Sequence, residues 1–408
     1  MKNKLIYEFS SQKTDGDASL SNLLGGKGAN LAEMSKLGIK VPAGFTITTE
    51  ACNYFSKNKK LPDGLQEEII NYVSNLENLS QKVFGKNESP LLLSVRSGGM
   101  ISMPGMMDSI LNIGLNDQNV QSLAKAFNDE RFAFDSYRRL IQMYSNVVLG
   151  VEMNRFEAVI ANKKRMDNVT SDADFNVDQL DWIINAYKNT VERFTNSSFP
   201  QDPHEQLLGA IEAVFSSWQN KRAMTYRKIN NIPDSLGTAA TVQTMVFGNL
   251  NDNSGTGVAF TRNPSNGTNE LYGEYLINAQ GEDVVAGIRT PHPIRNNEIV
   301  EQESLESKFP EGFKEIKEIA LKLEKHFKEV QDIEFTIENE EVYLLQTRKA
   351  KRTAQASIKI AIDLHNEGIT TKQESLIMVD ANNITNVLHP QFVESQEKAL
   401  FNKALNAS

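Results

Sequence analysis

Strand-like and helix-like segments occur in separate blocks along this 408-residue chain. Residues 1–116 mix short β-rich runs with helices. Residues 117–200 read as mostly helical, because apolar side chains recur every three or four positions. Residues 238–290 return to β-type runs with Gly and Asn turns, and residues 314–330 again have the spacing of an amphipathic helix. Blocks of this kind favour an α+β fold over a doubly wound sheet, in which strands and helices alternate.

Composition restricts the class of protein further. Hydrophobic content of 40% and charged content of 23% are ordinary for a globular protein. The formal net charge of −9 argues against a nucleic-acid or anionic-membrane partner. No apolar run approaches the roughly 18 residues needed to cross a bilayer, and the first residues show no secretory signal. The single cysteine, Cys52, fits a reducing compartment, so we expect a cytoplasmic protein.

The segment QDIEFTIENEEVYLLQTRKA, residues 331–350, predicts a β-hairpin. In its first half, apolar side chains alternate with those of Asp332, Glu334 and Thr336, so the three polar side chains share one face. Carboxylates on such a face could bind Mg²⁺, which prefers oxygen ligands. The alternative is a solvated face with cross-strand ion pairs.

The length of the hairpin loop decides which side chains meet across the strands. A three-residue loop at 339–341 pairs Glu334 with Gln346, and it then pairs Asp332 with Arg348. A two-residue loop would place Glu334 opposite Leu345 and mix the polar and apolar faces. We therefore expect the three-residue loop.

Two glycine-rich segments could approach phosphate. In LLGGKGANLAEMSKLG, residues 23–38, three glycines surround Lys27 just before a helix, where an anion is favoured. In SVRSGGMISMPGMMD, residues 94–108, Arg96 ends a strand and a loop rich in Gly and Met follows. The alternatives are a turn that caps a helix for the first segment and a plastic core for the second.

The segment 238–291 contains turn chemistry and a cluster of polar residues, YGEYLINAQGED. Spacing alone identifies no site there, and a polar loop beside a strand is the default interpretation. The histidines are scattered without metal-ligand spacing.

Together these motifs resemble pyruvate, phosphate dikinase. The resemblance covers residues 20–392, with the motifs in family order and long near-verbatim runs at 94–108 and 238–291. It implies an ATP-grasp fold with a helical insertion and a C-terminal helical linker, in which nucleotide lies between two β-containing subdomains. The implied regions are a first subdomain (1–116 with 201–245), a helical insertion (117–200), a second subdomain with the hairpin (246–349), and a linker and tail (350–408).

The resemblance also implies roles for individual residues. Lys27 and Arg96 match the family's phosphate-binding lysine and arginine, and Arg348 matches an arginine at the end of the hairpin strand. Asp332 and Glu334 match residues near the metal, which implies Mg²⁺. The expected nucleotide-binding residues are Gln243, Met245, Glu282 and Gln346.

Within the family, ATP and inorganic phosphate are substrates, AMP is a product, and a histidine on a second domain accepts the transferred group. No Gly-x-Thr-Ser-His-Ala-like segment is present in this chain. We therefore expect the phosphohistidine domain on another polypeptide. The alternative is a nucleotide-binding fragment or regulator without catalysis.

Overall fold

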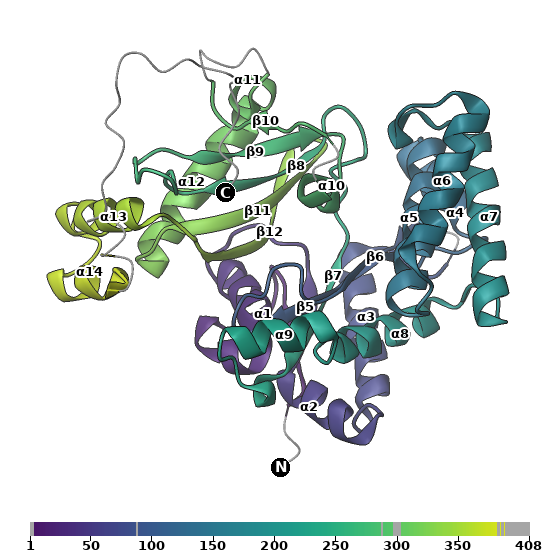
Figure 1. The fold of residues 1–408 in the computed structure, drawn as a ribbon, viewed down its shortest axis with the longest axis horizontal. Coiled ribbons are helices and arrows are strands. Elements are labelled where there is room, and N and C mark those ends of the chain that lie inside the picture. Colours follow the sequence, from purple (N-terminus) through teal and green to yellow (C-terminus); the bar gives the residue numbers. More distant parts are fainter. Residues whose placement is uncertain are drawn as a thin grey trace. The chain divides into compact units, whose positions relative to one another are not determined.

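The computed structural model divides into two compact units, Met1–Leu250 and Asn251–Ser408. It describes residues 4–86, 89–286, 289–296 and 303–381, together with residues 384 and 387. The tail segment LHPQF at 388–392 lies outside the described residues. Each unit combines helices with an antiparallel sheet, so the α+β prediction is confirmed (Figure 1).

The first unit contains a five-stranded sheet with the order β1-β2-β7-β5-β6. Every neighbouring pair is antiparallel. The strand β7 follows the helical block in sequence, yet it pairs with two strands from the first 116 residues. The strands are β1 (Ile6–Phe9), β2 (Gly44–Ile47), β5 (Leu93–Gly99), β6 (Ser109–Ile113) and β7 (Thr238–Thr244).

Several helices contact this sheet. The dipeptide Asp202-Pro203 is typical of a helix start, and helix α8 (Pro203–Ser217) begins there. The Asp202 side chain accepts hydrogen bonds from two backbone N–H groups of its first turn. Helix α1 contacts β5 and β7, and α8 contacts β5, β6 and β7. Outside the helical block at 117–200, this unit contains the α-helices α1 (Ser21–Lys36), α2 (Thr49–Asn58), α3 (Leu65–Ser80), α8 and α9 (Lys221–Ile229). It also contains a two-stranded parallel sheet, in which β3 (Val83–Phe84) pairs with β4 (Pro90–Leu91).

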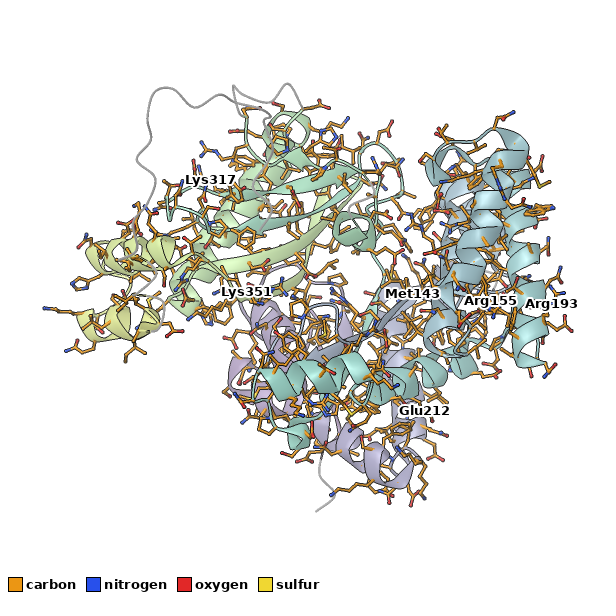
Figure 2. The ribbon with its side chains drawn as sticks, in the orientation of Figure 1. Met143, Arg155, Arg193, Glu212, Lys317 and Lys351 are labelled. Carbon is orange, nitrogen blue, oxygen red and sulfur yellow. The ribbon has the colours of Figure 1, made fainter. Side chains whose placement is uncertain are left out.

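The predicted helical block at 117–200 is confirmed as four α-helices: α4 (Val120–Phe127), α5 (Glu130–Val147), α6 (Met153–Asp167) and α7 (Val177–Thr195). Helix α5 contacts the other three and also β6. Met143 of α5, labelled in Figure 2, has its Sδ 3.3 Å from the backbone N of Leu111 in β6. The Arg155 guanidinium of α6 lies 3.7 Å from the Phe194 ring centroid of α7, which is a cation–π contact.

The second unit contains a five-stranded antiparallel sheet with the order β10-β9-β8-β11-β12. The strands are β8 (Gly255–Phe260), β9 (Tyr272–Ile277), β10 (His292–Pro293), β11 (Gln331–Glu338) and β12 (Glu341–Lys349). Helix α12 (Pro310–Phe327) contacts β11 and β12. It covers the apolar face, because a Cβ added at Gly312 would lie 3.5 Å from side-chain atoms of Ile337 and Val342.

The remaining helices of this unit are α10 (Gly281–Ala286), α11 (Leu305–Lys308), α13 (Ala354–Asn366) and α14 (Lys372–Met378). Thr371, followed three residues later by Glu374, has the sequence pattern of a capping box. The two residues form one at the start of α14, because each side chain accepts a hydrogen bond from the other residue's backbone N–H. The sequence predicts no helix at 281–286, where the default interpretation was a polar loop.

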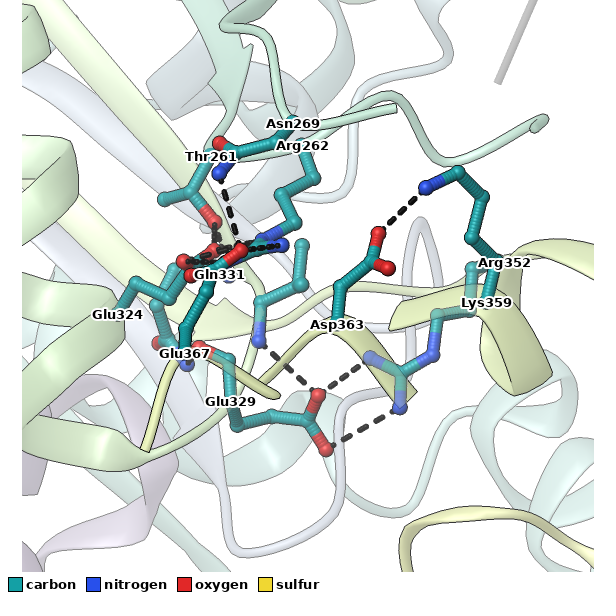
Figure 3. A network of polar contacts seen from close by, with 11 residues as sticks. Thr261, Arg262, Asn269, Glu324, Glu329, Gln331, Arg352, Lys359, Asp363 and Glu367 are labelled. Atoms are coloured by element: carbon teal, nitrogen blue, oxygen red, sulfur yellow. Dashed lines mark hydrogen bonds and ion pairs between the residues drawn. The ribbon is translucent and has the colours of Figure 1, made fainter. Parts of the chain in front are cut away.

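Helix α13 is held against the sheet at both ends (Figure 3). At its start, the Arg352 guanidinium pairs with Glu329. At its end, the fully buried Arg262 guanidinium pairs with Glu324 of α12 and with Glu367, with N···O distances of 2.7 Å. Between the two ends, Ile360 and other apolar residues of α13 belong to a buried cluster with Phe260 at the end of β8, Val330 just before β11 and Ala350 just after β12. The segment expected to be a linker therefore contains a helix that is anchored on the second unit.

Candidate functional site

The hairpin register agrees with the prediction, but the loop does not. Glu334 pairs with Gln346, and Asp332 pairs with Arg348, as expected. However, Glu338 pairs with Glu341, so the loop has only two residues instead of three.

Two local features reconcile the short loop with the predicted register. Asn339 and Glu340 have φ values of 48° and 70°, as a type I′ turn requires. The register then shifts between Glu334 and Phe335, which leaves Leu345 as the extra residue of a β-bulge. The bulge adds on β12 the residue that the loop lacks, so the polar side chains still meet.

The polar face of the second sheet extends beyond the hairpin. Glu334 pairs with Val258 of β8, and Val258 pairs with Glu274 of β9. Directly paired residues point to the same side of a sheet, so Glu274, Glu334 and Gln346 form one row across it. Asp332 and Arg348 lie in the adjacent row. The structure thus brings together four of the predicted residues of this unit.

Burial dominates the electrostatics of Asp332. The residue is 7% exposed, and Arg348 Nε donates to its Oδ2 at 2.7 Å. Burial raises the pKa of the Asp332 carboxyl above its usual value, and Arg348 only partly opposes this shift. Glu334 raises it further, whereas Lys351, labelled in Figure 2, lowers it. The charged form of Asp332 is therefore incompletely compensated, and a cation would stabilise it.

The donor set of this face suits Mg²⁺ in the presence of a phosphate ligand. Among the described residues, no group of three or more His, Cys, Asp or Glu side chains could hold a metal ion by itself. Mg²⁺ is usually bound by one or two carboxylates together with phosphate oxygens and water. Asp332 and Glu334, two positions apart on β11, supply such a pair.

In the first unit, the two glycine-rich segments lie against each other. Gly25 has φ +66° and interrupts α1, so Lys27 lies at the start of the helical part that follows. A Cβ at Gly25 would lie 1.8 Å from the carbonyl oxygen of Gly98, and a Cβ at Gly98 would lie 3.4 Å from Lys27 Cβ. Only glycine allows this approach of the two backbones.

Arg96 lies on the face of the first sheet that α1 covers. It pairs with Thr241 of β7, and Thr241 pairs with Thr46 of β2. A Cβ at Gly28 of α1 would lie 2.6 Å from Thr46 Oγ1, so α1 covers this face. Lys27 and Arg96, predicted from separate motifs, are thus positioned by elements that contact each other.

Gln243 lies on the same face, two positions from Thr241. Its side chain is 1% exposed, and its Nε2 donates to the Pro42 carbonyl at 2.9 Å. Met245 is half-buried just after β7, and its backbone N–H donates to the Leu92 carbonyl at 2.9 Å. The Gln243 carboxamide is therefore already used within the sheet.

The loop after Arg96 is anchored by residues that the sequence analysis missed. Arg222 of α9 donates from Nε to the Met106 carbonyl at 3.1 Å and forms an ion pair with Asp108. Asn220 Nδ2 donates to the other oxygen of Asp108 at 3.1 Å. Sequence spacing carries no signal for these contacts, because more than 100 residues separate the partners.

Glu282 lies in the first turn of α10 in the second unit and is partly buried. Helix α10 contacts β8, and a Cβ at Gly281 would lie 3.9 Å from Thr256 Oγ1. Thr256 pairs with Thr336, whose side chain points to the same face of the sheet as those of Asp332 and Glu334. Helix α10 therefore begins beside the polar face of this sheet.

Besides the polar face of the second sheet and the Lys27 and Arg96 region of the first unit, the chain matches a known class of nucleotide-binding domain. The chain matches the family model described as pyruvate phosphate dikinase, AMP/ATP-binding domain, over residues 21–84, 57–311 and 295–368, and it belongs to that family. It is 50% identical over 409 residues to pyruvate, phosphate dikinase of Clostridium symbiosum, and 48% identical over 410 residues to that of Rhizobium meliloti (strain 1021). It is 46% identical over 390 residues to chloroplastic pyruvate, phosphate dikinase 1 of Arabidopsis thaliana.

The alignments cover 99%, 99% and 95% of this chain but only 45%, 46% and 40% of the three relatives. The chain thus spans less than half the length of these relatives. No helix in the described part of the chain is long and apolar enough to cross a membrane.

Proposed function

We propose that this chain is the ATP-binding and pyrophosphoryl-transfer part of a pyruvate, phosphate dikinase, with an ATP-grasp fold. The pairing of Glu334 with Gln346 and of Asp332 with Arg348 on one sheet face carries this proposal. That face combines carboxylates for Mg²⁺ with a guanidinium for phosphate. Location in the cytoplasm stays a prediction that rests on the single cysteine.

The residues would act mainly by positioning and by neutralising charge. Asp332 and Glu334 would hold Mg²⁺, which neutralises polyphosphate oxygens when it is bound. Lys27, Arg96 and Arg348 would contact phosphate oxygens. Gln243, Met245, Glu282 and Gln346 would bind the remainder of the nucleotide.

The chemistry proposed for ATP has two steps. A histidine nitrogen on a separate phosphohistidine domain attacks the β-phosphorus, the bond to the α–β bridging oxygen breaks, and AMP leaves. Inorganic phosphate then takes the terminal phosphoryl group as pyrophosphate and leaves phosphohistidine. Over the full cycle, ATP, phosphate and pyruvate would give AMP, pyrophosphate and phosphoenolpyruvate, the last of these on a further domain of the dikinase.

Transfer of label tests the proposal. The chain is incubated with ATP labelled at the β-phosphorus, Mg²⁺ and a separately expressed phosphohistidine domain that accepts label from its own full-length enzyme. We expect label on the added domain, and its loss with Glu334→Gln but not with Glu340→Gln at the exposed hairpin turn. MgATP binding without transfer would instead support a nucleotide-binding module without catalysis.

A further inference from the structure

Gln280 has a buried side chain whose carboxamide finds no hydrogen-bond partner among the described residues. The residue is 4% exposed, and neither Oε1 nor Nε2 has a hydrogen-bond partner within the part of the chain that the structure describes. Its backbone, by contrast, is satisfied, because its N–H donates to Asp283 Oδ2 and its carbonyl accepts from Asp283 N, both at 2.9 Å. The unmet hydrogen-bonding capacity is therefore confined to the carboxamide.

Another buried glutamine of the same unit shows the usual arrangement. Gln331 is 3% exposed, its Nε2 donates to the Glu329 carbonyl, and its Oε1 accepts from Thr347 Oγ1, each at 3.0 Å. The large majority of buried side-chain polar atoms are bonded in this way. A buried carboxamide without partners destabilises the folded chain, and such a group is typical of a position kept for function.

Gln280 lies in a segment next to the polar face of the second sheet. It immediately precedes α10, which begins close to Thr256 on the polar face. Thr256 pairs with Thr336, two positions along β11 from Glu334. The carboxamide thus belongs to the segment that lies beside the row containing Glu334 and Gln346.

We propose that Gln280 is a nucleotide-binding residue whose carboxamide is satisfied by the nucleoside part of ATP; this inference rests on the proposed function. A carboxamide presents a donor and an acceptor side by side, and it matches the adjacent acceptor and donor on the edge of adenine. The triphosphate offers oxygen acceptors only, so it can satisfy the donor alone.

Ligand binding must then move this segment, because both carboxamide atoms are inaccessible to solvent in the structure. Helix α10 has only six residues, and Asp283 holds its start through the two hydrogen bonds to the Gln280 backbone. A small displacement of so short a helix, or a rotation of the side chain, would expose the carboxamide to the ligand.

The test combines stability with binding in the variant Gln280→Met, which replaces the carboxamide by an apolar side chain of similar size. We expect its melting temperature to rise by about 2–6 °C, since no hydrogen bond is lost and an unsatisfied group is removed. Gln331→Met serves as the control, and we expect it to lower the melting temperature because two hydrogen bonds are lost.

Binding is measured by titration calorimetry with MgATP and with magnesium tripolyphosphate. We expect Gln280→Met to weaken MgATP binding about tenfold and to leave tripolyphosphate binding unchanged. A lower melting temperature, unchanged MgATP affinity, or an equal loss for both ligands would overturn the assignment of Gln280. If the unsubstituted chain and Gln280→Met bind MgATP equally well, only the assignment of Gln280 fails. If the unsubstituted chain does not bind MgATP, the proposed function is overturned as well.

Discussion

Arg348 Nε donates a hydrogen bond to Asp332 Oδ2 at 2.7 Å, directly across the β11–β12 ladder. The guanidinium is 37% exposed and the carboxylate is 9% exposed, so the pair lies at the border of the buried region. Despite this partner, burial keeps the pKa of Asp332 above its ordinary value. The pair therefore leaves the carboxylate short of positive charge, which is the condition expected of a residue that binds a cation.

The raised pKa of Asp332 predicts how stability depends on pH. A carboxyl whose pKa is higher in the folded than in the unfolded state contributes stability below its unfolded pKa, near 3.8, and this contribution is lost as pH rises through the folded pKa. We expect Asp332→Asn to unfold at higher urea concentration than the unsubstituted chain at pH 7 and at a similar concentration near pH 3. A lower urea midpoint at pH 7 would show that the ion pair with Arg348 outweighs the cost of burial.

The close approach of α1 and β5 predicts different effects for two glycines that both have a positive φ. Gly25 and Gly38 have φ values of +66° and +73°, but a Cβ at Gly38 would meet nothing within 4 Å. We expect Gly38→Ala to reduce the free energy of unfolding by about 1–2 kcal/mol. Gly25→Ala adds a clash with the Gly98 backbone and should cost about 3 kcal/mol or more. Equal losses in chemical denaturation would refute the close approach.

The buried ion pairs of Arg262 predict a large effect of a single substitution. Arg262→Met would leave Glu324, with a side chain 4% exposed, as an uncompensated buried carboxylate. We expect a loss of about 3–5 kcal/mol in the free energy of unfolding. Arg295→Met, which breaks an exposed pair with Glu270, should cost less than about 1 kcal/mol. A similar small loss for both variants would mean that the Arg262 pairs do not anchor α13.

The two-residue hairpin turn predicts a stabilising substitution. Glu340 has φ +70°. A residue other than glycine adopts such a backbone conformation at a cost in free energy. We expect Glu340→Gly to raise the free energy of unfolding by about 0.5–1 kcal/mol. Glu341→Gly, at a paired strand position with an exposed side chain, should lower it by about 0.5–1 kcal/mol. A loss for Glu340→Gly would argue for the three-residue loop.

Periodicity and capping chemistry predicted much of the fold. The helical spacing at 117–200, the Asp202 cap and the Thr371–Glu374 box are local signals, and each corresponds to an observed element. Pairing between distant strands, such as β7 with β2 and β5, depends on tertiary packing, and no local pattern encodes it.

The hairpin shows both the use and the limit of pattern reasoning. Requiring Asp332 and Glu334 to share a face with polar partners selected the correct register. The prediction of a three-residue loop was wrong, because the polar–apolar pattern does not reveal the bulge at Leu345. Bulges depend on local twist and packing, which the polar–apolar pattern does not specify.

Two positions of the candidate site could not be predicted for similar reasons. The contacts of Arg222 with Asp108 and the Met106 carbonyl join segments far apart in sequence. The unsatisfied state of Gln280 is a property of its three-dimensional surroundings, and a glutamine in a polar segment carries no mark of it.

Calorimetric titration of the chain with ATP, with and without Mg²⁺, tests whether the hairpin face binds the metal and the nucleotide. We expect binding that requires Mg²⁺, that weakens at least about tenfold in Glu334→Gln, and that is unchanged in Glu340→Gln. Melting temperatures of both variants establish that they are folded. Equal affinity of folded Glu334→Gln and the unsubstituted chain for MgATP would contradict the assignment of the hairpin face as the metal and nucleotide site.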